Sequence, residues 1–135
     1  MNYISQNPTE THNLANQLLK QFPHLSIWLI YGDLAAGKTT LVKGLGDSLN
    51  INPKKIKSPT FTLVSEFPNL IHYDLYRLSE LDETLQSQIE EHLKSPKLTV
   101  IEWPELIEEQ VESPHLKIRI AHLGKDQREF IIEEY

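Results

Sequence analysis

One segment constrains the fold of this chain more than any other: residues 32–39, with the sequence GDLAAGKT. It matches the pattern G-x-x-x-x-G-K-[ST] of a phosphate-binding P-loop. An apolar run at residues 27–31 directly precedes it, and leucine and valine recur at helical spacing after it. A strand, a glycine-rich loop and a helix in this order are the setting in which the motif binds nucleotide phosphates. The segment therefore predicts an α/β fold with a site for a nucleoside triphosphate.

The residues of the loop have distinct expected roles. Glycine at its first and sixth positions lets the backbone turn tightly and approach a phosphate without a Cβ in the way, and successive backbone N–H groups form an anion-binding nest. We expect Lys38 to reach the terminal phosphates, the Thr39 hydroxyl to bind Mg²⁺ and Thr40 to contact another phosphate. The predicted nucleotide-binding residues of the loop are Gly32, Ala35, Ala36, Gly37, Lys38, Thr39 and Thr40.

The composition predicts a single P-loop domain over residues 1–135, located in the cytoplasm. A net charge of −6 argues against a chain that grips nucleic acid unaided. The charge is uneven, however, because residues 38–57 carry five lysines and one aspartate, whereas residues 80–112 carry ten acids and two lysines. Such runs are typical of solvated helix faces. The chain has no cysteine, which excludes disulfides and thiol chemistry, and it shows no long apolar run or signal-like start.

The order of the predicted elements indicates a three-layer α/β/α fold, a P-loop NTPase-like arrangement whose mixed sheet has a parallel core, antiparallel additions and a C-terminal hairpin. Asn7, Pro8 and Glu10 are typical of a helix start, and Pro23 is expected to end this helix. Another helix is expected to begin at Ser79. The other predicted elements are strands at residues 26–31, 60–64, 70–74, 98–101, 116–122 and 128–134, the P-loop helix, and a short acidic helix after residue 105.

Two acids are candidates for the metal side of the site. A P-loop needs an acidic residue at the end of a neighbouring strand, where it holds Mg²⁺ directly or through water. Asp74 ends the apolar run at 70–73 and Glu102 ends the run at 98–101, so either carboxylate could face the metal or simply terminate a strand. His72 lies in an apolar run, which favours a core or hairpin histidine. Trp103 could pack on the base, in the core or against a partner.

Four segments follow one another along the chain: GDLAAGKTT at 32–40, SPTFTLV at 58–64, HYDLYRL at 72–78 and IEWPE at 101–105. Together they closely resemble the TsaE (YjeE) family of bacterial P-loop ATPases. The resemblance implies a P-loop ATPase, with ATP and Mg²⁺ as its ligands, that is needed to form threonylcarbamoyladenosine next to the anticodon of tRNA. It further implies that the protein acts with TsaB and TsaD and meets tRNA through their complex, without a membrane or DNA partner. TsaD-type partners would carry the transfer chemistry, and this member would reset or drive the complex.

The resemblance also assigns roles to individual residues. It implies that Thr39 and Glu102 hold Mg²⁺, that Asp74 has a second role linked to hydrolysis, and that residues 58–62 form a switch-like loop near the γ-phosphate. It brings Glu10, Thr11 and Asp126 towards the adenine. Two departures stand out: Ala35 replaces a usual glycine, which is tolerable only if its φ stays negative, and residues 77–101 are unusually acidic and lack a usual glycine.

Three other functions are weighed against an ATPase. A small-molecule kinase commonly closes basic residues over its second substrate, but this chain has only three arginines and no evident arginine-bearing lid. A GTPase is disfavoured because no Asn-Lys-x-Asp segment is present. A nucleotide-gated assembly module with vestigial hydrolysis remains an alternative. Because few cations other than Lys38 are evident near the phosphates, we expect weak ATPase activity that partners raise.

Overall fold

The computed structural model of this chain describes residues 1–33, 35–56 and 63–135. In this part of the chain a seven-stranded sheet has the order β1-β7-β6-β2-β5-β4-β3. The strands are β1 (Asn2–Ser5), β2 (Ile27–Tyr31), β3 (Val64–Glu66), β4 (Leu70–Asp74), β5 (Leu98–Glu102), β6 (Leu116–Gly124) and β7 (Gln127–Glu134). The helices are α1 (Pro8–Gln21), α2 (Lys38–Ser48) and α3 (Glu83–Leu93), with short 3₁₀ helices η1 (Pro53–Lys55), η2 (Pro104–Leu106) and η3 (Glu108–Gln110).

The sheet confirms the predicted α/β class. Its four central strands, β6, β2, β5 and β4, run parallel, and β1, β7 and β3 are antiparallel additions. All five residues of β2 are buried, as expected for the central strand of a parallel core that is covered on both faces. The carboxyl ends of β2, β4 and β5 therefore meet at one edge of the sheet, where open α/β folds place their ligands.

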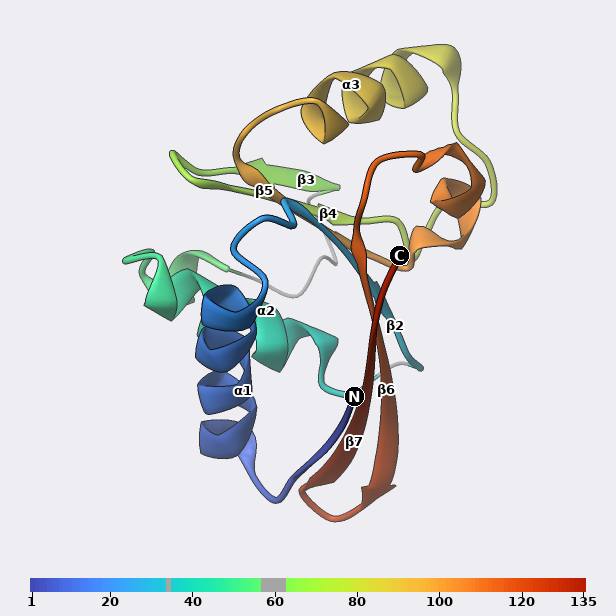
Figure 1. Cartoon of the computed structure of the whole chain (residues 1–135). Helices are drawn as coiled ribbons and strands as arrows, with labels where there is room; N and C mark the ends of the chain where they lie inside the picture. The colour runs from blue at the N-terminus through green and yellow to red at the C-terminus, as the bar shows by residue number, and fades with distance from the viewer. Residues whose placement is uncertain (34, 57–62) are drawn as a thin grey trace.

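Helices cover the two faces of the sheet separately (Figure 1). Helices α1 and α2 pack on one face, where Leu14 of α1 and Leu41 of α2 are fully buried against β2 residues such as Trp28. Helix α3 covers the other face and buries Ile89 against Tyr73 of β4. Each fully buried leucine or isoleucine side chain contributes about 1.5–3 kcal/mol to folding. The sheet thus separates the P-loop helix from α3.

Helices α1 and α2 approach each other unusually closely. A Cβ added at Gly44 of α2 would lie 2.8 Å from the Cα of His12 in α1, so only glycine fits this crossing. The start of α1 agrees with the sequence prediction, because the Asn7 side chain accepts the Glu10 N–H at 2.9 Å and Pro8 occupies the first turn. The crossing at Gly44 thus holds α1, at His12 in its second turn, closely against the P-loop helix.

Several element boundaries differ from the sequence expectation. Helix α3 begins at Glu83 rather than near Ser79, because the Asp82 side chain accepts the Leu85 N–H at 2.7 Å and caps the helix there. The expected acidic helix is the pair of short 3₁₀ turns η2 and η3. Both predicted hairpins are present, as β3 with β4 and β6 with β7. The first hairpin strand was expected at residues 60–64; the structure describes it from Val64 to Glu66, and residues 57–62 lie outside the described part.

Strand β1 is absent from the sequence prediction, which placed the first strand at residues 26–31. It has only four residues, and it owes its strand conformation to antiparallel pairing with β7, in which Tyr3 lies opposite Phe130. Local periodicity over four residues is too short to distinguish such an edge strand from a loop. No helix in the described ranges is long and apolar enough to cross a membrane.

Candidate nucleotide and metal site

The P-loop connects the end of β2 to the start of α2, as the motif predicts. Gly37 has φ 113°, which glycine adopts readily and other residues rarely adopt. A Cβ at Gly32 would lie 2.8 Å from the carbonyl oxygen of Ile120 in β6, so the first glycine is needed for close packing against the sheet. No side chain of the described residues caps the N-terminus of α2. Its first N–H groups are therefore available to an anion.

Lys38 folds back over its own loop. Its ammonium donates hydrogen bonds to the carbonyl oxygens of Gly32, at 2.5 Å, and Asp33, at 2.7 Å, and the residue is only 5% exposed. Burial lowers the pKa of this ammonium, while the negative charges of Glu102 and Asp74 act in the opposite direction. The sole cation of the P-loop motif thus lies between the loop and the two acids that the sequence singled out.

Ala35 corrects one sequence expectation. The sequence analysis accepted alanine here only on the condition that φ is negative, but its φ is 61°, in the left-handed region. This conformation costs a non-glycine residue on the order of 1 kcal/mol. The tight turn of the loop, in which the Ala36 N–H donates to the Asp33 carbonyl at 3.0 Å, holds it there. Ala36 itself is buried against Gly32.

The two candidate acids are neighbours across the sheet. Asp74 and Glu102 are register partners at the ends of the parallel strands β4 and β5, so their side chains point to the same face, that of α2. Both are buried. Burial raises the pKa of Asp74 to about 6, and the nearby Glu102 charge acts in the same direction, whereas a hydrogen bond from the Tyr76 N–H to Oδ1 opposes it. Paired strands therefore bring both acids to one place.

Glu102 has a buried partner that the sequence analysis assigned to the core. His72 Nε2 lies 2.5 Å from Glu102 Oε2, and both side chains are nearly inaccessible to solvent. His72 is indeed buried, as predicted, but its ring reaches a candidate metal ligand. The pattern of an apolar strand with histidine two residues before its terminal acid is the only sequence signal that could have indicated this contact.

Trp103 directly follows Glu102 and has φ 56° and ψ 57°. Its ring lies 4.3 Å from the Lys38 ammonium, measured to the ring centre, and 4.9 Å from the ring of Tyr76. The sequence left Trp103 open between the base, the core and a partner; the structure packs it partly against the core on the α3 side and beside the P-loop lysine, which the sequence analysis did not predict. Tyr76, which the sequence analysis did not single out, completes this aromatic pair.

The donor set suits Mg²⁺. Thr39 lies in the first turn of α2, and Thr39, Asp74 and Glu102 all offer oxygen ligands, which this ion prefers. Residues 1–33, 35–56 and 63–135 contain no group of three or more His, Cys, Asp or Glu side chains placed to hold a metal alone. A magnesium ion here would therefore complete its shell with phosphate oxygens and water, as is usual for nucleotide-bound Mg²⁺.

The residues expected near the base come from both ends of the chain. A small cavity of about 40 Å³ lies beside Gly37, lined by Asn7, Pro8, Thr11, Gly37, Thr40, Asp126 and Arg128. A more open hollow of about 440 Å³, lined by Gln6 and residues 123–127, shares Asp126 with it. Thr11 and Asp126 thus lie beside Thr40. Glu10 does not line the cavity, because its carboxylate accepts the Gln6 N–H at 2.9 Å.

Arg128 is a cation that the sequence analysis did not place near the loop. Its Nη2 lies 3.4 Å from the Ala35 carbonyl oxygen, and its side chain covers Gly37. Nothing local in the sequence indicates this, because 93 residues separate Arg128 from Ala35. Arg77, three residues after Asp74 in the chain, is exposed. Lys54 and Lys55 are exposed on η1.

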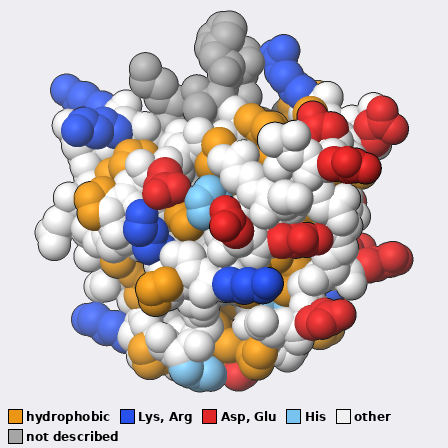
Figure 2. Space-filling view, turned by 90° about the horizontal axis from the view of Figure 1, so that it is seen from above, with side chains coloured by type: hydrophobic (Ala, Val, Ile, Leu, Met, Phe, Trp, Pro, Cys, Tyr) orange, Lys and Arg blue, Asp and Glu red, His pale blue; other side chains and the backbone are white. Residues whose placement is uncertain are grey.

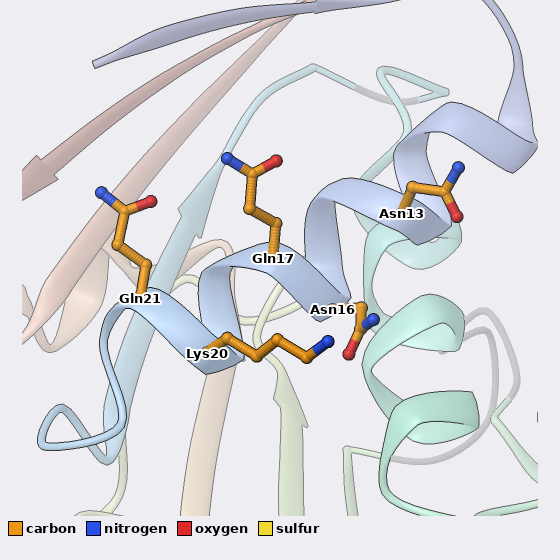
Figure 3. Close-up of a pocket in the computed structure, with 5 residues that line it drawn as sticks. All are labelled: Asn13, Asn16, Gln17, Lys20 and Gln21. Carbon is orange, nitrogen blue, oxygen red and sulfur yellow. The ribbon is translucent and has the colours of Figure 1, made fainter.

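Two other surface features lie apart from the P-loop. A hollow of about 400 Å³ is lined by residues of α1 alone, whose amide and lysine side chains project outward (Figure 3): Asn13, Asn16, Gln17, Lys20 and Gln21. In the view from above, acidic side chains gather on one side of the molecule (Figure 2). The exposed acids of α3 and of the segment before it are Glu80, Asp82, Glu83, Glu90 and Glu91.

Comparison with known proteins gives a consistent result. A family model described as "Threonylcarbamoyl adenosine biosynthesis protein TsaE" matches residues 5–130. The tRNA threonylcarbamoyladenosine biosynthesis protein TsaE of Bacillus subtilis (strain 168) is 35% identical over 127 residues, which cover 91% of this chain and 78% of that protein. The protein of the same name from Treponema pallidum (strain Nichols) is 30% identical over 135 residues, which cover 98% of this chain and 99% of that protein. The crystal structure of Bacillus subtilis YdiB matches with a TM-score of 0.73 and 31% identity, covering 96% of this chain and 82% of that one.

Proposed function

The chain belongs to the TsaE family, and from this membership and the site geometry we propose that it binds and hydrolyses ATP with Mg²⁺ during threonylcarbamoyladenosine formation in tRNA. One observation carries the proposal. The P-loop lysine, Lys38, lies between its glycine-rich loop and the two buried carboxylates that end β4 and β5, Asp74 and Glu102. This is the charge arrangement that a triphosphate with its metal requires.

Different residues of the chain would bind the phosphates, the metal ion and the base. The N–H groups at the start of α2 bind phosphate oxygens, and Lys38 exchanges its two loop carbonyls for the terminal phosphates. Thr39 and Glu102 would hold Mg²⁺, which when bound neutralises charge on the β- and γ-phosphates. Thr11, Thr40 and Asp126 border the cavity beside Gly37, on the side where the base would lie.

Asp74 is suited to a different task from Glu102. Its Oδ1 accepts the Tyr76 N–H, which leaves Oδ2 to accept a proton from the attacking water. A pKa raised to about 6 makes this carboxylate a better proton acceptor near neutral pH than an ordinary aspartate. This supports the separate, hydrolysis-linked role of Asp74.

We further propose that TsaB and TsaD are the partners, and that tRNA is met through their complex. Support comes from the family and from the scarcity of cations at the site. Of the described lysines and arginines, Lys38 and Arg128 contact the P-loop. A loose phosphoryl-transfer transition state gains several powers of ten in rate from a further cation. A partner that supplies or orders one would therefore accelerate hydrolysis.

The test measures ATP binding by calorimetry and phosphate release by the purified chain, with Mg²⁺ or EDTA, and with or without the TsaB–TsaD complex. We expect Mg²⁺-dependent ATP binding, slow release by the chain alone and faster release with the complex. GTP in place of ATP serves as the specificity control. Absence of ATP binding would refute the proposal, whereas binding without hydrolysis even with partners would favour a nucleotide-gated assembly module.

A further inference from the structure

We infer that His72 is a positioning residue for Glu102, an inference that rests on the function proposed above. The His72 Nε2–H donates to Glu102 Oε2 at 2.5 Å. This hydrogen bond fixes the carboxylate and leaves Oε1 for the magnesium ion or its water shell. His72 itself touches neither nucleotide nor metal.

The sheet register produces this contact. Asp74 lies opposite Glu102 and His72 lies opposite Val100, so His72 is the diagonal neighbour of Glu102 on the adjacent parallel strand. Residues 72 and 74 are two positions apart in β4, so their side chains lie on the same face of the strand, the face towards α2. The imidazole can therefore reach the carboxylate only from the side away from the strand end. Strand β3 continues the ladder beyond it, with Ser65 opposite His72.

Because the His72–Glu102 pair is buried, losing this hydrogen bond would leave the Glu102 carboxylate without a donor that water could replace. His72 is 4% exposed and Glu102 is 1% exposed, and a buried carboxylate without a hydrogen-bond donor is costly. The described residues contain two further histidine–glutamate pairs, His24 with Glu134 and His92 with Glu66, and both glutamates are about half exposed. Only the pair at the strand ends is removed from solvent, which is where a ligand to a metal needs outer-shell support.

A second buried histidine shows what a purely structural role looks like. His115 is 7% exposed, its Nδ1 lies 2.8 Å from the Ser113 carbonyl oxygen, and its ring stacks on Tyr135 at 5.4 Å between centres. It reaches no carboxylate in the described part of the chain. His115 therefore provides a matched control for the loss of a buried imidazole.

The experiment titrates Mg²⁺ into the full chain saturated with a non-hydrolysable ATP analogue and measures the concentration at half-saturation by calorimetry. Analogue affinity in EDTA and the thermal unfolding temperature are recorded for each variant. Loss of an outer-shell partner typically weakens metal affinity by 10–100-fold. We therefore expect His72→Leu to raise the half-saturating Mg²⁺ concentration by about 10–100-fold, with analogue affinity in EDTA unchanged within about 3-fold. His115→Leu should leave the Mg²⁺ value at that of the wild type.

Conservative variants separate the donor from the ring. His72→Gln can place an amide N–H near the position of Nε2 and should keep the Mg²⁺ value within a few-fold of wild type. The side chain of His72→Asn is shorter and cannot reach Glu102. This variant should therefore raise the half-saturating Mg²⁺ concentration as much as His72→Leu does. If His72→Leu does not fold, the comparison of His72→Gln with His72→Asn decides the question, and equal Mg²⁺ values for these two and the wild type overturn the inference.

Three further results have different meanings. A wild-type chain that fails to bind the analogue refutes the proposed function itself, before any variant is made. A wild-type chain that binds with Mg²⁺, together with a His72→Leu variant that has an unchanged Mg²⁺ value, overturns only the positioning role. Equal weakening of analogue binding in EDTA and in Mg²⁺ also overturns it, because that pattern indicates general structural damage.

Discussion

The ammonium of Lys38 lies 4.3 Å from the centre of the Trp103 ring, while it also donates to two carbonyl oxygens of its own loop. A phosphate that draws Lys38 towards itself must compete with all three of these partners. Trp103 directly follows Glu102 along the chain, so the lysine of the P-loop and the end of β5 are linked through one aromatic ring. This link is a direct route by which nucleotide binding can alter the surroundings of Trp103.

Lys38→Met tests the phosphate side of the site. Hydrogen bonds to charged groups contribute about 1.5–3 kcal/mol each, so we expect ATP affinity measured by calorimetry to fall at least about 10–100-fold. The methionine keeps the apolar stem beside Trp103, and thermal unfolding should show that the fold survives. Affinity within a few-fold of wild type would place the triphosphate elsewhere.

Glu102→Gln and Asp74→Asn should fail at different steps. The glutamine keeps the shape of Glu102 but carries no charge for the metal, so Mg²⁺-dependent ATP binding should be lost. Asp74→Asn should bind Mg²⁺-ATP more nearly normally and release phosphate much more slowly, because it cannot accept a proton. Calorimetry and single-turnover phosphate release distinguish the two. The reverse pattern would exchange the roles of the two acids.

Asp74 should also make the stability of the metal-free protein depend on pH. Its pKa is about 6 in the folded chain, against an ordinary value of 3.8, because it is buried. Between these values the folded state holds a proton that the unfolded state has lost, so stability falls as pH rises through this window. Asp74→Asn removes this cost. Because one pKa unit corresponds to about 1.4 kcal/mol, the variant should gain about 1–3 kcal/mol over wild type at pH 8.

Urea denaturation in EDTA at pH 8 and at pH 4.5 provides the measurement for this effect. The advantage of Asp74→Asn over wild type should shrink at the lower pH, where Asp74 is largely protonated in the folded state. An equal advantage at both values would show that the asparagine acts through packing rather than through charge.

Ala35→Gly should stabilise the chain. The left-handed φ of 61° strains an alanine, and the gain on removing that strain exceeds the entropy that glycine adds to the unfolded chain. We expect the free energy of unfolding of Ala35→Gly to exceed that of the wild type by about 0.5–1 kcal/mol. Ala36→Gly is the matched control, because Ala36 is buried and has no positive φ. It should lose about 0.5–1 kcal/mol, and the same sign for both variants would contradict the strain argument.

The exposed lysines of η1 provide a test of the partner surface. We expect the TsaB–TsaD complex to raise the ATPase rate of this chain, and the double variant Lys54→Glu/Lys55→Glu to weaken that stimulation, because it reverses charge on an exposed face. Lys20→Glu/Lys94→Glu changes the net charge equally at exposed sites outside η1 and should retain the stimulation. Repeating the titration at two salt concentrations checks that the effect is electrostatic. Equal stimulation of both double variants would exclude η1 from the interface.

The features that could be predicted from the sequence are those that a local sequence pattern determines. The P-loop, the start of α1 at Asn7 and Pro8, and the two hairpins follow from motif spacing, capping residues and alternation, and the structure contains them. The parallel core was predicted from the order of the helices and strands along the chain. These features are encoded within about ten to twenty neighbouring residues each.

What could not be predicted depends on partners distant in the chain. Strand β1 pairs with β7, and His72 meets Glu102 through the register of two parallel strands 30 residues apart. Arg128 reaches the P-loop from the far end of the chain. Ala35 does not meet the condition of a negative φ, because the closing of the loop, rather than the preference of alanine, sets this dihedral. In each of these cases, contacts between distant parts of the chain or the closing of a loop override local preference.

The tight crossing of α1 and α2 at Gly44 determines which parts of the site can move. Because the two helices leave no room for even one methyl group between Gly44 and His12, they cannot act as a hinge that opens for a ligand. Thr11 on α1 and Thr40 on α2 are therefore held in fixed positions relative to each other. Opposite them lies the exposed turn of the β6–β7 hairpin, where no atom of the described residues lies within 4 Å of a Cβ added at Gly124. Under the proposed function, we therefore expect any closure on a nucleotide to involve that turn rather than a movement between α1 and α2.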